Sequence, residues 1–169
     1  MGTTKKYSWI HSLVQKVAAS KTGAWISSHI LHHVDRIVFR LSGHRATFSS
    51  LIAGVPVVML TSKGAKSGLL RTVPLLCIRD ENDPASFALI ATNWGQKSYP
   101  AWYYNLKANP EAVCSIAGKA RGYLAHEAQG EEYERFWQYA SNIYFGYPLY
   151  KQRIAGRSIP IMVMKEIDK

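Results

Sequence analysis

Apolar residues in the first quarter of the chain recur at the spacing of an amphipathic helix. In residues 8–19 they follow the i, i+3, i+4, i+7 pattern, and a second stretch over residues 24–41 repeats it. The turn-forming residues 20–23 separate the two stretches, and Gly43 ends the second. The pattern therefore predicts two N-terminal helices.

After residue 50 the pattern changes to short runs rich in β-branched residues, bounded by glycine, proline, asparagine and aspartate. These runs predict six strands, at residues 55–61, 71–79, 86–93, 112–116, 120–128 and 159–165. Helical patterns cover residues 101–108 and 131–142. Short strands in hairpins with helices around them indicate an α+β fold that is mainly β, a small six-stranded antiparallel barrel with helices packed outside.

Composition and length favour one globular domain with a basic extension. The chain has 169 residues, 47% of them hydrophobic, and a formal net charge of +10. The first 45 residues contain seven lysines and arginines but a single acidic residue, Asp35. We therefore treat residues 1–45 as a basic amphipathic helical segment and residues 46–169 as the barrel domain. That segment could lie on an anionic membrane, pack on the barrel or form a homodimer face.

Our expectations for localisation and metal binding rest on four features that we looked for in the sequence: a membrane span, a secretory signal, a cysteine motif and a set of metal ligands. No apolar run approaches the roughly 20 residues of a membrane span, and no secretory signal is evident. Two cysteines 37 residues apart form neither a disulfide framework nor a CxxC motif. We expect a cytoplasmic protein, with peripheral contact at the inner membrane face left open. His29 and His33 stand one helical turn apart, but no further ligands accompany them, so we expect no metal.

The loop over residues 61–71 is the most informative motif. It joins two predicted strands and combines glycines, hydroxyls and cations, a set that suits an anion such as phosphate. It is not a P-loop, because Ala65 precedes Lys66 where that motif has glycine, and a strand follows rather than a helix. A solvated turn is the alternative interpretation. The candidate residues are Lys63, Gly64, Lys66, Ser67, Gly68 and Arg71.

Two aromatic motifs follow. Residues 92–95, Thr-Asn-Trp-Gly, lie at a strand exit where a flat ring could approach the backbone, and the helix beginning at Pro100 carries Trp102 on a face that would pack on the barrel. Three tyrosines spaced by three, Tyr144, Tyr147 and Tyr150, could line one wall of an aromatic pocket. An ordinary core location would explain them equally well.

Taken together, these motifs resemble the deazaflavin-dependent nitroreductase family, also described as quinone reductases. The resemblance runs from about residue 35 to residue 166 and is strongest at Gly64–Gly68, at Arg71-Thr-Val-Pro-Leu75 and at residues 100–110. It implies a split β-barrel like those that bind FMN. It also implies coenzyme F420, a deazaflavin with a phosphodiester and an oligoglutamate tail, whose hydride is passed to a quinone or nitroaromatic acceptor.

The resemblance also implies roles for residues. Lys63, Lys66 and Arg71 would hold the tail, and Tyr144, Tyr147 and Tyr150 would shape the acceptor pocket and carry the catalytic contacts. The ring would contact Thr72, Pro74, Leu76, Thr92, Asn93, Trp94 and Gly95, with Trp102 and Asn105 as further cofactor-site candidates.

Two departures from the family pattern leave alternatives open. Trp94 stands where a glycine is usual, and Leu76 where some members carry tyrosine. FMN in the same barrel, or a barrel that carries a cofactor or lipid without turnover, are the alternatives. The basic charge alone suggests nucleic acid, but the aromatics form no evident stacking platform, so we expect no nucleic-acid partner.

Overall fold

The computed structural model describes residues 56–144, 146–154 and 156–167. The predicted helices at residues 8–19 and 24–41, the histidines at positions 29 and 33, and the whole basic segment 1–45 lie outside these residues. None of the described helices is long and apolar enough to span a membrane.

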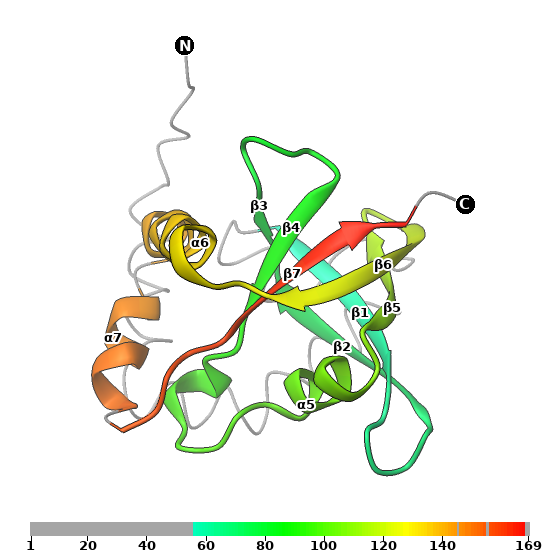
Figure 1. Cartoon of the computed structure of the whole chain (residues 1–169), viewed down its shortest axis with the longest axis horizontal. Helices are drawn as coiled ribbons and strands as arrows, with labels where there is room; N and C mark the ends of the chain where they lie inside the picture. Colours follow the sequence, from blue (N-terminus) through cyan, green and yellow to red (C-terminus); the bar gives the residue numbers. More distant parts are fainter. Residues whose placement is uncertain (1–55, 145, 155, 168–169) are drawn as a thin grey trace.

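Seven antiparallel strands form a single curled sheet, in the order β2-β1-β5-β6-β7-β4-β3 (Figure 1). The strands are β1 (Val57–Lys63), β2 (Leu70–Leu76), β3 (Ile78–Arg79), β4 (Ser86–Ile90), β5 (Glu111–Ile116), β6 (Lys119–Glu127) and β7 (Ile161–Glu166). The β5–β6 hairpin closes through Ala117 and Gly118, both at positive φ, which matches the right-handed twist of the strands. The antiparallel α+β class is confirmed.

The prediction of one strand over residues 71–79 was wrong, and with it the count of six. Cys77 interrupts the run, and its N–H donates to the carbonyl of Pro56 at 2.9 Å. The pieces on either side, β2 and β3, are the two opposite edges of the sheet. Since only one residue joins these edges, the sheet has to curl until they meet, as in a half-closed barrel. The uninterrupted apolar run Val-Pro-Leu-Leu-Cys-Ile carries no signal for this break.

Within the residues that the structure describes, three α-helices and one short 3-10 helix surround the sheet. The helix α5 (Ala101–Ala108) has the predicted bounds, and α6 (Gly130–Ile143) extends the prediction by one residue at each end. Neither α7 (Gly146–Arg153) nor the 3-10 helix η2 (Asn93–Gly95) was predicted. Figure 1 shows α6 and α7 together on one side of the sheet, and α5 beside the lower ends of β1 and β2.

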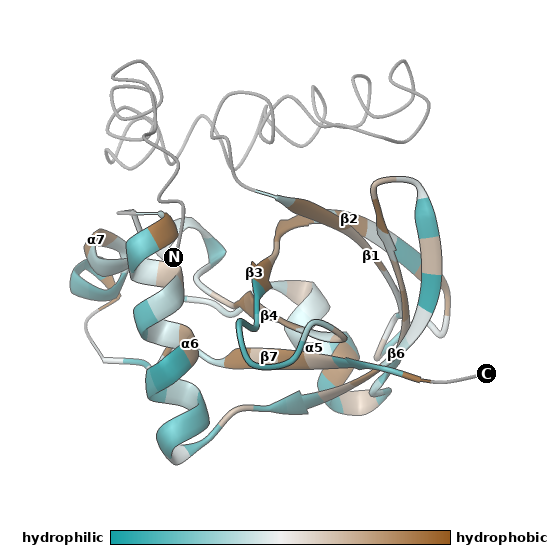
Figure 2. Cartoon of the chain, turned by 90° about the horizontal axis from the view of Figure 1, so that it is seen from above, coloured by the Kyte–Doolittle hydropathy of each residue, from teal (hydrophilic) through white to brown (hydrophobic). Residues whose placement is uncertain are grey.

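Two apolar cores lie on the two faces of the sheet. The inner core fills the curl and includes Leu60, Leu89 and Met162, together with Trp102 and Leu106 of α5, as predicted for this helix. The outer core lies between the sheet and the helices α6 and α7. In Figure 2 much of β2 and β7 is brown, whereas α6 is mostly teal and white, as expected for a helix with one buried face.

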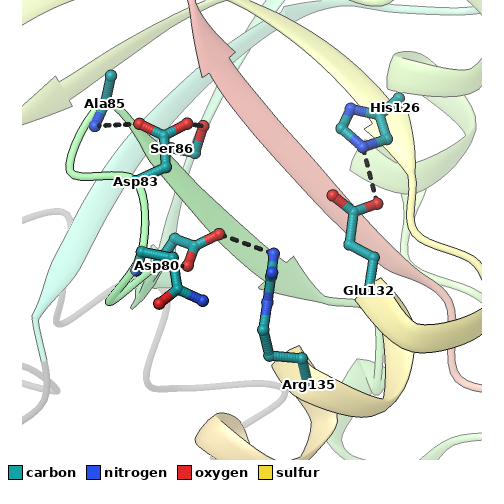
Figure 3. Close-up of polar contacts among 8 residues, drawn as sticks. Asp80, Asp83, Ala85, Ser86, His126, Glu132 and Arg135 are labelled. Carbon is teal, nitrogen blue, oxygen red and sulfur yellow. Dashed lines mark hydrogen bonds and ion pairs between the residues drawn. The ribbon is translucent and has the colours of Figure 1, made fainter.

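Two ion pairs join α6 to the strands (Figure 3). A guanidinium nitrogen of Arg135 donates to the buried carboxylate of Asp80 at 2.9 Å, and His126 lies 2.9 Å from Glu132. Glu131 and Glu132 stand in the first turn of α6, where the helix dipole favours negative charge. The Arg135–Asp80 contact holds α6 at the edge of the sheet where β3 ends, and the His126–Glu132 contact holds it to β6.

Candidate functional site

The loop between β1 and β2 needs both of its glycines. A Cβ on Gly64 would lie only 2.6 Å from the Ser67 hydroxyl oxygen, and Gly68 has a φ of +67°, which a side chain rarely adopts. The hydroxyl of Ser67 accepts a hydrogen bond from the N–H of Leu69 at 3.3 Å. The residues that sequence analysis selected in this loop therefore form one compact turn.

Most backbone amides of this turn have acceptors within the protein. The N–H of Gly64 donates to the carbonyl of Leu69, and that of Gly68 donates to the carbonyl of Gly64. The N–H of Ala65 donates to the side chain of Asn105, and that of Leu69 to Ser67. Among the N–H groups of residues 64–69, those of Lys66 and Ser67 are therefore the ones that an anion could meet. Any anion held here would depend mainly on side chains.

The cations of the loop are exposed and share no ion pair. Lys63, Lys66 and Arg71 all face solvent. Across residues 56–144, 146–154 and 156–167, the contacts between basic and acidic side chains involve other basic residues, namely Lys107, Arg121, His126 and Arg135. Three unpaired positive charges within nine residues create a local field that attracts a polyanion.

Asn105 and Trp102 support this loop from α5. The buried Asn105 amide accepts from the N–H of Ala65 at 3.0 Å and donates to the hydroxyl of Ser62 at 3.4 Å. Trp102 is 7% exposed and packs in the inner core. Both were selected as cofactor-site residues, and the structure gives each of them a supporting contact within the protein.

The strand β2 leads from the cationic loop to the outer core. Thr72, Pro74 and Leu76 share one face of the sheet with Thr61 and Met59 of β1. The hydroxyls of Thr72 and Thr61 lie 2.8 Å apart. Pro74 and Leu76 are half-buried, and Leu76 packs against the outer core. Arg71 and Leu76 are five residue steps apart along the strand, a span of about 17 Å.

At the far end of this face the chain makes a tight turn after β4. Asn93, Trp94 and Gly95 all have positive φ, at 49°, 58° and 77°. The indole of Trp94 is half-buried against the outer core, the cluster on which Leu76 also packs. Thr92 is buried, and the amide of Asn93 donates to the carbonyl of Ser98 at 3.0 Å. Predicted site residues from β2 and from this turn therefore meet at one core.

The three tyrosines cluster in the outer core and are 5%, 3% and 2% exposed, in the order Tyr144, Tyr147 and Tyr150. The hydroxyls of Tyr144 and Tyr150 lie 3.1 Å apart, and the ring of Tyr147 meets that of Tyr144 edge-on at 5.2 Å. Burial raises the pKa of all three phenols, with neighbouring tyrosines adding to it for Tyr147 and Tyr150. They are therefore neutral hydroxyls at physiological pH.

Sequence reasoning missed two contributors. Arg157 donates hydrogen bonds to carbonyls on both sides of the turn, and Tyr99 stacks on its guanidinium at 4.5 Å. No local pattern marks Arg157, which is one arginine among many cations. A surface hollow along α6, between Gly130 and Asn142, contains none of the predicted site residues.

Comparison with known proteins points to one family. A family model described as F420H(2)-dependent quinone reductase matches residues 33–166. The F420H(2)-dependent quinone reductase Rv1261c of Mycobacterium tuberculosis is 30% identical over 147 residues, which cover 83% of this chain and 95% of that protein.

Solved structures agree. An F420-H2 dependent reductase, FDR-A, is 34% identical with a TM-score of 0.59, over 65% of this chain and 94% of that one. A second structure, described as a domain-swapped dimer, is 30% identical with a TM-score of 0.61, over 79% and 97% of the two chains. The heme storage protein HutZ of Vibrio cholerae shares the fold at 8% identity, with a TM-score of 0.51 over 80% and 92%.

Proposed function

Because this chain belongs to the F420H(2)-dependent quinone reductase family, we propose that it binds reduced coenzyme F420 and reduces a quinone or a nitroaromatic compound. The observation that carries the proposal is the arrangement along β2. Unpaired cations stand at one end, and a half-buried apolar surface beside buried aromatic rings stands at the other.

The residues present fit the two chemically different parts of this cofactor. Lys63, Lys66 and Arg71 would hold the phosphodiester and the glutamates of the tail, because all three are exposed and lack ion-pair partners among the described residues. Pro74 and Leu76 would contact the flat ring system and exclude water from it. The strand β2 joins the loop cations to Pro74 and Leu76, so the two binding surfaces would lie along one line, as the ring and the tail of the cofactor do.

When bound, the cofactor would supply a hydride, and the protein would orient the partners and manage the proton. The buried hydroxyls of Tyr144 and Tyr150 form a pair that can donate a hydrogen bond toward an acceptor oxygen. Because their pKa values are raised, they are poor acids. We therefore assign to them charge stabilisation by hydrogen bonding, and assign the net proton to water.

A titration of the purified protein with oxidised F420, beside a parallel titration with FMN, tests the proposal. We expect saturable binding of F420 and much weaker binding of FMN, which has a single phosphate and no glutamate tail. Reduced F420 should then be oxidised on addition of a quinone panel or a nitroaromatic panel. Tight FMN binding with no response to F420 would favour a flavin enzyme instead.

Two further proposals concern the surroundings of the enzyme. The basic segment 1–45 would contact an anionic membrane, which would bring a lipid-soluble quinone within reach. Sedimentation with anionic vesicles at low and high salt tests this contact.

Since a related structure is a domain-swapped dimer, we also propose a homodimer, which light scattering would detect.

A further inference from the structure

The turn after β4 is held in a costly backbone conformation. Asn93 and Trp94 both lie in the left-handed region, at φ values of 49° and 58°, and Gly95 follows at 77°. Residues other than glycine rarely adopt this region, and two in succession persist only where the surrounding structure holds them. The chain must therefore contain a group that fixes this turn.

The guanidinium of Arg157 is that group. Its Nη2 donates to the carbonyl of Thr92 at 3.0 Å, to that of Gln96 at 2.8 Å and to that of Ser98 at 3.3 Å. Its Nε donates to the carbonyl of Gln96 at 3.2 Å. One acceptor precedes the strained residues and two follow them, so the arginine ties the two ends of the turn together.

Arg157 is itself held in place by its neighbours. Its Nη1 donates to the carbonyl of Ser158 at 2.9 Å, and its guanidinium lies 4.5 Å from the ring centre of Tyr99. The hydroxyl of Tyr99 lies 3.3 Å from that of Ser158. The planar fork of arginine carries five donors in a fixed geometry and stacks flat on a ring, whereas the compact ammonium of lysine has three donors and cannot reproduce that arrangement.

We propose that Arg157 is a positioning residue of the deazaflavin site, which fixes the turn so that Trp94 is presented at the ring end of that site. The inference rests on the proposed function, because the turn matters for catalysis only if the ring lies beside it. Arg157 acts through the backbone of Thr92, Gln96 and Ser98 and needs no contact with the cofactor.

The first arm of the test needs no cofactor. The N–H of Gly95 donates to Thr92 and that of Gln96 donates to Asn93, so hydrogen exchange at these two amides reports on the turn. In Arg157→Ala we expect both to exchange at least about tenfold faster, with the strand amides of β4 unchanged. Arg121→Ala, which removes an exposed arginine paired with Glu166 elsewhere on the sheet, should change neither. Unchanged exchange in Arg157→Ala would overturn the positioning role.

The second arm measures F420 affinity in the same proteins. Arg157→Ala should weaken binding by about tenfold or more, and Arg157→Lys should fail to restore it. Millimolar ethylguanidinium should recover part of the lost affinity in Arg157→Ala, which general destabilisation would not allow. Arg157→Gln, which keeps two donors, serves if the alanine variant does not fold.

The hydrogen-exchange arm and the F420-affinity arm distinguish a failure of the role assigned to Arg157 from a failure of the proposed function. Faster exchange with unaltered F420 affinity would show that the turn is fixed by Arg157 but lies outside the site, and would refute the inference. If the wild-type protein binds no F420, the proposed function is refuted and the assigned role of Arg157 in that site falls with it. The exchange result then still decides whether Arg157 fixes the turn.

Discussion

The side-chain oxygen of Asn105 accepts a hydrogen bond from the backbone N–H of Ala65 at 3.0 Å. This bond joins α5 to the loop that carries Lys66, and the amide nitrogen of Asn105 extends the link to Ser62. Because Asn105 is buried, its loss leaves polar groups without partners. The loop is therefore shaped by a residue 40 positions away in the chain.

Replacing this asparagine should loosen the loop. We expect Asn105→Ala to lower the free energy of unfolding by about 1–3 kcal/mol and to weaken F420 binding. Urea denaturation and cofactor titration measure the two effects. Asn109→Ala, at the half-buried residue that follows the last turn of the same helix, is the matched control and should change stability by less than about 0.5 kcal/mol. Equal effects of the two substitutions would contradict the bracing role.

The cationic loop should bind the cofactor through charge. Lys66→Ala is expected to weaken F420 binding about tenfold at low salt, with a smaller difference at high salt because ions screen exposed charges. Lys119→Ala removes an exposed lysine from the β5–β6 hairpin and leaves the site intact. Similar losses in both variants would point to a general attraction by the basic surface.

At Gly95 the strained turn packs closely against Tyr150 of α7. A Cβ there would lie 3.2 Å from Cδ1 of Tyr150, and φ is +77°. Gly95→Ala should therefore cost more than Gly118→Ala, where φ is +81° but nothing lies within 4 Å. The difference in unfolding free energy isolates the contact, and we expect it to exceed about 1 kcal/mol. Equal costs would mean that the turn and Tyr150 can move apart readily.

How much of this architecture the sequence predicts depends on whether the signal is local. The helix at residues 101–108 begins after a proline and ends before Asn109, and its predicted bounds are those observed. Most strand cores were also predicted, because each strand has turn residues at its ends. The break at Cys77 was missed because it arises from closure of the sheet, and the neighbouring apolar residues look like one strand.

The residues of the candidate site also fall into two groups, those with a local sequence signal and those that only the fold brings together. The glycines and cations of residues 63–71 are adjacent in the chain, so their chemistry can be recognised from spacing alone. Arg157 is 65 residues from Thr92, and only the fold brings its guanidinium to that carbonyl. The burial of Tyr147 likewise depends on α7 packing beside α6, a contact for which three evenly spaced tyrosines give no indication.

The tyrosine pair should behave as a coupled unit. Tyr144→Phe and Tyr150→Phe each remove one partner of the 3.1 Å contact, and we expect each to cost about 1 kcal/mol of stability. The double variant should cost less than the sum, since both substitutions remove the same interaction. Turnover should fall in the single variants, with little change in F420 affinity. Additive costs would show that the two hydroxyls do not interact.

The buried thiols give the fold a pH dependence. Burial raises the pKa of Cys77 and of Cys114 to about 12, above the unfolded value of 9.0. Between pH 9 and 12 the unfolded state therefore loses protons that the folded state keeps, so the free energy of unfolding falls as pH rises. The slope is at most about 1.4 kcal/mol per pH unit for each thiol.

Urea denaturation at several pH values, under reducing conditions, measures this slope. The double variant Cys77→Ala/Cys114→Ala should show a flatter decline above pH 9 than the wild type. If both proteins decline equally, these thiols do not control the alkaline loss of stability.

The central claim is that one end of β2 binds a polyanionic tail and the other end a flat ring. Titrating the wild-type protein with F420 and with the same deazaflavin lacking the phosphodiester and glutamates separates the two contributions. The tail-free compound should bind at least about tenfold more weakly, and its affinity should not depend on salt. Equal, salt-independent affinities for the two compounds would contradict the account.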